Sequence, residues 1–277
     1  MKLLARFFFL IFSVGMTASC APITVQYYSV EYIYENRRVD STGDPTWIEK
    51  IVYTFDNEKE GRVTSAFVYE NGNETKPVAY LLYTYWDLNE LSHQAIDNRL
   101  RTVERYSDDD IFKTENGAKV KDPVKSVSKL IRYDVYETDA KDGKCLSVKT
   151  YRYNSHDPVI ENRNIPMSAK QFKYFSDLSS RFLPEEETVS LFLAGRWVYQ
   201  SSARIRYEKI SGKKAVVEKR FFVNPVSEED WYCIETFTYD DKGYPVRVER
   251  YTAEEYRKDV SVRIPEKTVL YVTEEKR

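Results

Sequence analysis

The sequence predicts a mainly β fold, an antiparallel meander that forms an open or partial barrel with one amphipathic helix packed on it. Apolar and polar residues alternate with a period of two in many short runs, as they do in strands with one buried face. Turn residues separate these runs. The chain is also rich in aromatic residues, with 23 Tyr and 14 Phe against 9 Gly among 277 residues. Aromatic side chains favour strands and argue against disorder.

Segment 234–251 shows the pattern most clearly. Phe237 and Tyr239 alternate with threonines, Asp241-Lys242-Gly243 reverses the chain, and Val248 lies on the returning run. A tight hairpin needs a residue with positive φ, which glycine adopts without a steric cost. We therefore expect a hairpin here with Gly243 at positive φ.

Similar runs predict strands along the whole chain. Segment 88–106 fits either a helix or a strand, and the strand is favoured, whereas 107–124 is expected to be a loop with three consecutive aspartates. The remaining predicted strands cover 23–35, 47–55, 63–69, 77–86, 126–153 as a long hairpin, 189–193, 196–207, 215–223, 260–264 and 268–272.

Residues 168–182 are predicted to form the helix. Phe172, Phe175, Leu178 and Phe182 recur at helical spacing and would make one apolar stripe. Such a stripe packs onto a sheet or covers the end of a barrel. The helix could also join two halves, 20–165 and 183–277, of a single β-rich domain.

Residues 1–19 have the three parts of an export signal. Lys2 and Arg6 form a positive start, 7–16 is an apolar segment too short to span a bilayer as a helix, and small residues lead to Cys20. We therefore expect 1–19 to be a signal peptide that precedes the β-rich domain, residues 20–277.

Thr17-Ala18-Ser19-Cys20 resembles the lipobox of bacterial lipoproteins. Thr17 stands where that motif usually has a large aliphatic residue, and in this the segment is similar to the looser form of spirochaete lipoproteins. The resemblance implies a lipid on Cys20 and a protein of the bacterial cell envelope, anchored in the lipid bilayer on the periplasmic or outer surface. Ordinary cleavage after Ala18 is the alternative, or cleavage after Ala21, where Pro22 makes the site a poor one.

A second motif recurs where strands enter turns: an aromatic, a polar residue and an aromatic, followed in most copies by Asp or Asn. The aromatic residues at i and i+2 would share one face of a strand. The motif resembles the degenerate tyrosine-aspartate β-hairpin repeats of bacterial cell-surface proteins, which implies a structural or binding role. The copies are Tyr53-Thr54-Phe55-Asp56, Tyr83-Thr84-Tyr85, Tyr151-Arg152-Tyr153-Asn154 and Phe237-Thr238-Tyr239-Asp240.

Motifs for catalysis, cofactors or metals are not found in the sequence, so none of these is expected. The two histidines, His93 and His156, belong to no metal-binding pair. Cys145 and Cys233 could form a disulfide in an exported protein or remain buried thiols, and both alternatives stay open. With 42 basic and 44 acidic residues, the chain has no basic surplus that would indicate nucleic acid.

We therefore expect a non-enzymatic binding or structural module of the envelope. The alternative is a carrier of a hydrophobic ligand or of acyl chains, similar to the lipoprotein-sorting proteins in which a half barrel and a helix enclose them. The partner would be another envelope protein or that ligand. The aromatic residues expected to face it are Trp47, Trp86, Phe172, Phe175, Trp197 and Trp231.

Overall fold

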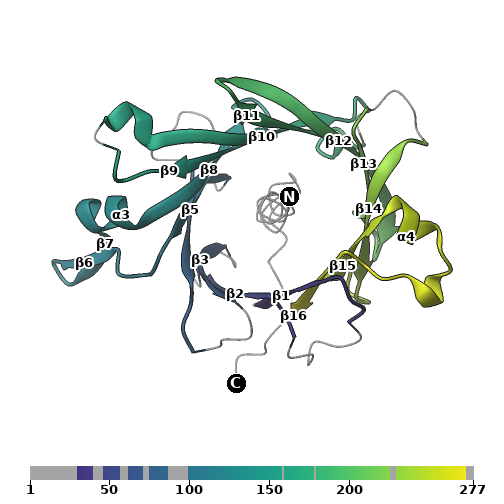
Figure 1. Ribbon diagram of the computed structural model, residues 1–277, viewed down its shortest axis with the longest axis horizontal. Helices are drawn as coiled ribbons and strands as arrows, with labels where there is room; N and C mark the ends of the chain where they lie inside the picture. The colour runs from purple at the N-terminus through teal and green to yellow at the C-terminus, as the bar shows by residue number, and fades with distance from the viewer. Residues whose placement is uncertain are drawn as a thin grey trace.

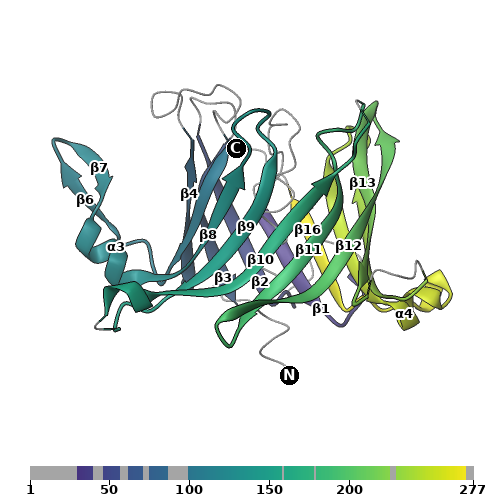
Figure 2. The ribbon, with the colours of Figure 1, turned by 90° about the horizontal axis from the view of Figure 1, so that it is seen from above.

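The strands of the protein close into one antiparallel barrel of 14 strands, seen end-on in Figure 1 and from the side in Figure 2. The computed structural model describes residues 30–39, 46–56, 62–70, 75–86, 99–157, 159–177, 179–224 and 229–272. Strands adjacent in the wall are antiparallel throughout, and the order follows the chain except that the β6–β7 hairpin is left out of the wall.

The wall is an up-and-down meander. Its strands are β1 (Val30–Glu35), β2 (Glu49–Phe55), β3 (Val63–Glu70), β4 (Ala79–Tyr85), β5 (Leu100–Tyr106), β8 (Leu130–Thr138), β9 (Cys145–Tyr153), β10 (Asn164–Tyr174), β11 (Pro184–Leu193), β12 (Arg196–Ile210), β13 (Lys213–Phe222), β14 (Trp231–Tyr239), β15 (Pro245–Thr252) and β16 (Lys267–Val272). The other elements are β6 (Phe112–Glu115), β7 (Ala118–Lys121), α3 (Pro123–Lys129), η3 (Ile160–Arg163), α4 (Ala253–Arg257) and η4 (Val260–Val262).

The two ends of the barrel differ. One end, called here the Gly243 end, carries the short turns 139–144, 211–212 and 240–244. The opposite end, called the α4 end, carries α3, η3, α4 and η4. In Figure 2 the Gly243 end lies at the top and the α4 end at the bottom.

The hairpin between β14 and β15 confirms the prediction for segment 234–251. The Asp240 carboxylate accepts hydrogen bonds from the backbone N–H groups of Lys242 at 3.0 Å and Tyr244 at 2.8 Å. Gly243 has φ +84°, in the left-handed region that favours glycine.

The barrel is closed, so the prediction of an open or partial barrel is wrong in that respect. β1 pairs with β2 on one side and with β16 on the other, and Val30 lies opposite Val272. This pairing joins the first and last described strands. No local pattern in either segment distinguishes a closing strand from an edge strand.

The predicted helix at 168–182 is also wrong. Residues 164–174 form β10, which pairs with β9 and β11, and Leu178 lies outside the described residues. The segment fits the period of a strand as well as that of a helix, because Phe172 and Tyr174 alternate with Gln171 and Lys173. Pairing with a strand on each side satisfies the backbone hydrogen-bonding groups along the whole of β10, and this favours the strand over the helix.

Three smaller predictions are resolved as well. Segment 100–106 is the strand β5, whereas 87–98 lies outside the described residues. Segment 107–124 is more ordered than a loop, because it contains the β6–β7 hairpin and the start of α3. Segment 260–264, predicted as a strand, contains η4.

Candidate functional site

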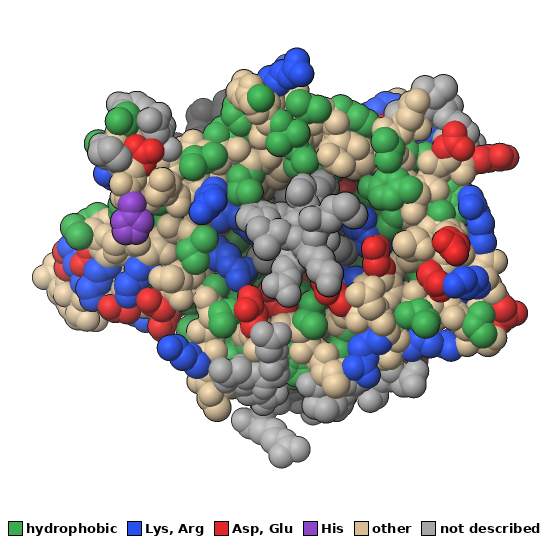
Figure 3. Space-filling view, viewed as in Figure 1, with side chains coloured by type: hydrophobic (Ala, Val, Ile, Leu, Met, Phe, Trp, Pro, Cys, Tyr) green, Lys and Arg blue, Asp and Glu red, His purple; other side chains and the backbone are tan. Residues whose placement is uncertain are grey.

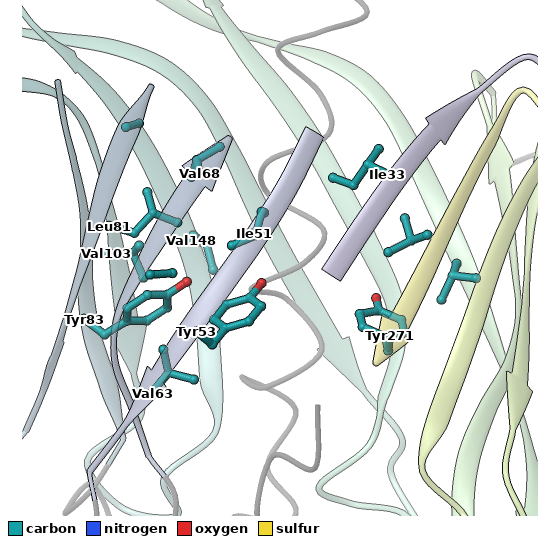
Figure 4. Close-up of a cluster of buried hydrophobic side chains, with 14 of the residues drawn as sticks. Ile33, Ile51, Tyr53, Val63, Val68, Leu81, Tyr83, Val103, Val148 and Tyr271 are labelled. Carbon is teal, nitrogen blue, oxygen red and sulfur yellow. The ribbon is translucent and has the colours of Figure 1, made fainter. Parts of the chain in front are cut away.

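The inner wall of the barrel gathers most of the buried side chains. Successive side chains of a strand face opposite sides, and residues paired across neighbouring strands share a side. The largest buried cluster follows this rule over most of the wall, and Figure 4 shows its members within the barrel. The labelled ones come from β1–β5, β9 and β16: Ile33, Ile51, Tyr53, Val63, Val68, Leu81, Tyr83, Val103, Val148 and Tyr271.

Aromatic residues line the inner wall toward the Gly243 end, and we call this group the aromatic zone. It contains both aromatic residues of three copies of the repeated motif, so the expectation that they share one strand face is confirmed there. In the fourth copy, Tyr151 stacks on Tyr133 on the other side of the wall. The aromatic zone comprises Tyr53, Phe55, Tyr83, Tyr85, Tyr136, Phe172, Tyr174, Tyr207, Phe237, Tyr239 and Tyr271.

Four tyrosines of the aromatic zone make the same contact. Each lies in the last part of its strand and donates a hydrogen bond to a backbone carbonyl near the start of the preceding wall strand. The pairs are Tyr85 with Val63 at 2.9 Å, Tyr174 with Cys145 at 2.7 Å, Tyr207 with Pro184 at 2.8 Å and Tyr239 with Val216 at 2.6 Å. Burial raises the pKa of Tyr85 to about 12, so its phenol keeps the proton that it donates.

Charged residues also face inward, and on the strands that carry both kinds of residue they lie nearer the α4 end than the aromatic residues. They form the charged belt: Glu31, Glu49, Arg105, Arg132, Asp134, Lys170, Glu187, Lys219, Glu235, Arg250 and Lys267. Glu31 is the exception in position, because it lies opposite Tyr271 near the start of β1. The register places opposite charges side by side, since Glu235 lies between Lys219 on β13 and Arg250 on β15. Figure 3 looks onto the α4 end and shows acidic and basic side chains around its centre.

The tightest part of the charged belt is a triad on three strands. A Glu187 carboxylate oxygen lies 2.5 Å from Lys219 Nζ, and its second oxygen lies 3.3 Å from Lys170 Nζ. All three side chains are buried. Burial alone would raise the pKa of Glu187, but the charges of Lys170 and Lys219 outweigh it and lower that pKa to about 2.

A second cluster lies at the seam where β1 meets β16. Tyr53 donates a hydrogen bond of 2.8 Å to the carboxylate of Glu31, which also interacts electrostatically with Lys267. Burial raises the pKa of Glu31 to about 7, against the opposing effects of Tyr53 and Lys267. Burial also lowers the pKa of Lys267 to about 8. Both groups therefore change charge within a few pH units of neutrality.

Two further acids of the charged belt are held more loosely. Arg250 approaches Glu235 to 3.6 Å, and Arg132 approaches Asp134 to 3.9 Å. Burial raises the pKa of both carboxyls, and the neighbouring arginines oppose that rise only in part. Perturbed pKa values cluster at functional sites, which makes the charged belt the candidate site of this protein.

The six aromatic residues predicted to face a ligand do not form one site. Phe172 alone among them packs against the large inner cluster. Phe175 contacts Tyr207. The four tryptophans lie apart: Trp47 packs with Tyr34, Val39 and Leu270, Trp86 under Arg101, Trp197 against Phe192, and Trp231 against Tyr256.

Cys145 and Cys233 are both buried free thiols, so the alternative of a bridge between them is excluded in this structure. Cys20 and His93 lie outside the described residues, and His156 is exposed in a turn. Within the described ranges, no three His, Cys, Asp or Glu side chains gather to hold a metal ion. None of the described helices is long and apolar enough to cross a membrane.

Comparison with known proteins identifies no family. No family model matches the chain, and neither does any curated protein. Among solved structures, a porin-like protein from Bacteroides uniformis is 11% identical, with a TM-score of 0.36 over 90% of this chain and 98% of that one.

Two shorter structures also align. A protein of unknown function from Bacteroides fragilis is 12% identical, with a TM-score of 0.30 over 51% of this chain and 88% of that one. A DUF3836 family protein from Bacteroides vulgatus is 12% identical, with a TM-score of 0.22 over 43% of this chain and 89% of that one. These scores are too low to transfer a function, so the case for one depends on the inner wall.

Proposed function

We propose that this protein is a bacterial envelope lipoprotein, anchored through a lipid on Cys20, whose barrel is a non-enzymatic binding module with its binding surface on the inner wall. The observation that carries the proposal is the charged belt. Burying an ion pair costs several kcal/mol per ion in desolvation, and apolar residues of similar volume often stabilise a protein equally well. Eight of the 11 residues of the belt are buried, so the belt suits the recognition of a polar ligand better than packing.

The size of the barrel supports the same function. Barrels of eight strands are filled by their own side chains, whereas barrels of 16 or more enclose a channel. With 14 strands, this wall is closer in strand number to the barrels that enclose a channel than to those filled by their own side chains. A ligand that spans both parts of the inner wall would place charged groups at the belt and apolar groups at the aromatic zone.

The outer wall favours anchoring through the N-terminal lipid. Its strands carry exposed ion pairs, such as Lys149 with Glu137 and Arg206 with Glu208. Exposed charges of this kind suit contact with water rather than with acyl chains. The membrane attachment is therefore assigned to Cys20, where two or more acyl chains would give stable binding.

Anchoring is tested by metabolic labelling with radioactive palmitate. The full chain is expected to incorporate the label and to stay in the membrane fraction after a carbonate wash at high pH. Cys20→Ser should lose both properties, whereas the control Cys145→Ser, which alters a buried thiol, should keep them. An unlabelled full chain would contradict the lipoprotein assignment.

The second candidate function, a carrier of a hydrophobic ligand, is favoured by the aromatic zone next to the charged belt. A fatty acid would set its carboxylate near Lys170 and Lys219 and its acyl chain along residues such as Phe172. We expect saturable binding of a fatty acid with a fluorescent acyl chain. Phe172→Ala and Lys219→Met should weaken it, and Lys149→Met on the outer wall should not. No saturable binding would exclude the carrier and leave a polar ligand.

A further inference from the structure

Exposed large hydrophobic side chains are concentrated at one end of the barrel. Those at or next to the connections of the α4 end are Val78, Val124, Val127, Ile131, Val159, Ile160, Ile165, Leu193, Trp197, Tyr199, Val223, Tyr232, Val260, Val262 and Ile264. We call this set the apolar rim. Among the exposed large hydrophobic residues of the described ranges, Leu146 is the exception, because it lies at the start of β9 at the Gly243 end.

The apolar rim is a ring rather than a single patch. Its members come from six connections of the wall, those between β3 and β4, β5 and β8, β9 and β10, β11 and β12, β13 and β14, and β15 and β16. Figure 3 shows hydrophobic side chains distributed around this end. A globular partner that fits one groove would contact one or two of these connections, whereas a flat surface meets all of them together.

The most exposed members lie on protruding segments. Val124 in α3 is 78% exposed, Ile160 in η3 is 68% exposed and Val260 in η4 is 67% exposed. Leu193 and Trp197 flank the two-residue turn between β11 and β12, and Trp197 is 41% exposed. Tryptophan and tyrosine are enriched where a protein meets the boundary between lipid and water, because one end of the side chain is apolar and the other is polar.

We propose that the apolar rim is a membrane-contact surface, on which the barrel stands with its α4 end against a lipid bilayer. This proposal adds an orientation to the proposed anchor. Residues 20–30 can extend to about 35 Å. A 10-residue strand such as β11 rises about 26 Å along an axis from which it is tilted by about 40°. The tether is therefore long enough for a lipid on Cys20 to reach the bilayer, although β1 starts at the Gly243 end.

Apolar insertion, rather than attraction between opposite charges, would provide the binding. The connections of the rim carry acidic as well as basic residues, such as Asp259 and Arg257 beside η4. Binding by shallow insertion scales with the apolar area that is buried. It should therefore occur on vesicles without net charge and persist at high salt, which screens contacts between exposed charges.

The test uses the exported Cys20→Ser chain and vesicles of phosphatidylcholine. We expect this chain to sediment with the vesicles in 0.5 M salt and its tryptophan emission to shift to shorter wavelength. Ile160→Asp, Leu193→Asp and Val260→Asp together should lower the partition coefficient by about tenfold or more. The matched control is Leu146→Asp, which places the same charge at the other end. All four side chains are exposed, so unchanged circular dichroism and Tm would confirm folding.

Three results would overturn the proposal: no binding of the parent chain, equal loss with Leu146→Asp, or dimers that the rim substitutions dissociate without any vesicle binding. The last would identify a second copy of the chain as the occupant. Failure of the anchor is distinguishable from failure of the rim, because palmitate labelling depends on Cys20 alone and the vesicle assay is carried out without the lipid.

Discussion

Replacing Glu187 by glutamine tests how the charged belt contributes to stability. The carboxylate lies 2.5 Å from Lys219 Nζ and 3.3 Å from Lys170 Nζ, and all three groups are buried. Glu187→Gln keeps the shape of the side chain but removes its charge. Two buried ammonium groups then remain close together without the carboxylate that neutralises them.

The structure sets the size of the expected loss. The pKa of Glu187 falls from 4.5 to about 2, and one pKa unit corresponds to about 1.4 kcal/mol. The charged form is therefore favoured by about 3 kcal/mol in the folded state. Removal of one partner of a buried ion pair usually costs about 3–5 kcal/mol. We expect Glu187→Gln to lower the free energy of unfolding by about 3 kcal/mol at pH 7.

The pH dependence gives a second check. A carboxyl whose pKa is lowered by folding contributes stability above its unfolded value, and the contribution is lost as the pH falls through the folded value. The difference between the two proteins should therefore shrink as the pH falls from 4.5 toward 2. Urea unfolding followed by circular dichroism measures it, with Glu137→Gln on the outer wall as the control. A loss below about 1 kcal/mol at pH 7 would refute the reasoning.

Two further predictions concern the seam and the turns. Because burial raises the pKa of Glu31 from 4.5 to about 7, the folded state binds the proton more tightly, so stability should fall as the pH rises across that interval. Glu31→Gln should remove this loss of stability, which comparison of the urea midpoints of the two proteins at pH 5 and 7 would reveal. An equal change of midpoint with pH in both proteins would contradict the prediction. Gly243→Val should cost about 1 kcal/mol or more, because Gly243 has φ +84° and a Cβ there would lie 3.2 Å from Ser211 Cβ. Gly117 has φ +80° and open space where a Cβ would lie, so Gly117→Val should lower the stability less in thermal unfolding. An equal loss would show that backbone strain, and not contact with Ser211, determines the cost of both substitutions.

Local patterns predicted the strands and turns because period-2 alternation and the Asp-x-x-Gly turn act over a few residues. Asp240 and Gly243 are an example, since their roles depend on the turn alone. Closure of the barrel depends on the pairing of Val30 with Val272, and no short stretch of sequence contains both residues. Segment 168–182 failed for a different reason: its aromatic residues satisfy both periods, and only the neighbouring strands decide between them.

The candidate site was missed because its residues look ordinary in sequence. A lysine within a strand, such as Lys170 or Lys219, usually faces water, and alternation does not tell which side of a closed wall is the inside. The only available signal was the position of single charges within otherwise apolar alternation, as with Glu235 between Cys233 and Phe237. The tryptophans attracted attention through their size, yet most of them pack locally in the wall or its connections.

The proposed ligand site and the proposed membrane surface explain each other's position. Most soluble domains bury apolar side chains and expose charges. Here most of the charged belt is buried inside the wall, on the α4 side of the aromatic zone in the strands that carry both, and the apolar rim is exposed at the α4 end. If each feature served packing alone, nothing would require them to share an end. An amphiphile that leaves a bilayer under the rim would meet the charged belt, which includes Lys170 and Lys219, with its charged group, and the aromatic zone lies beyond the belt for its apolar part. A barrel that bound its ligand from the Gly243 end would need neither the rim nor the belt where they are found.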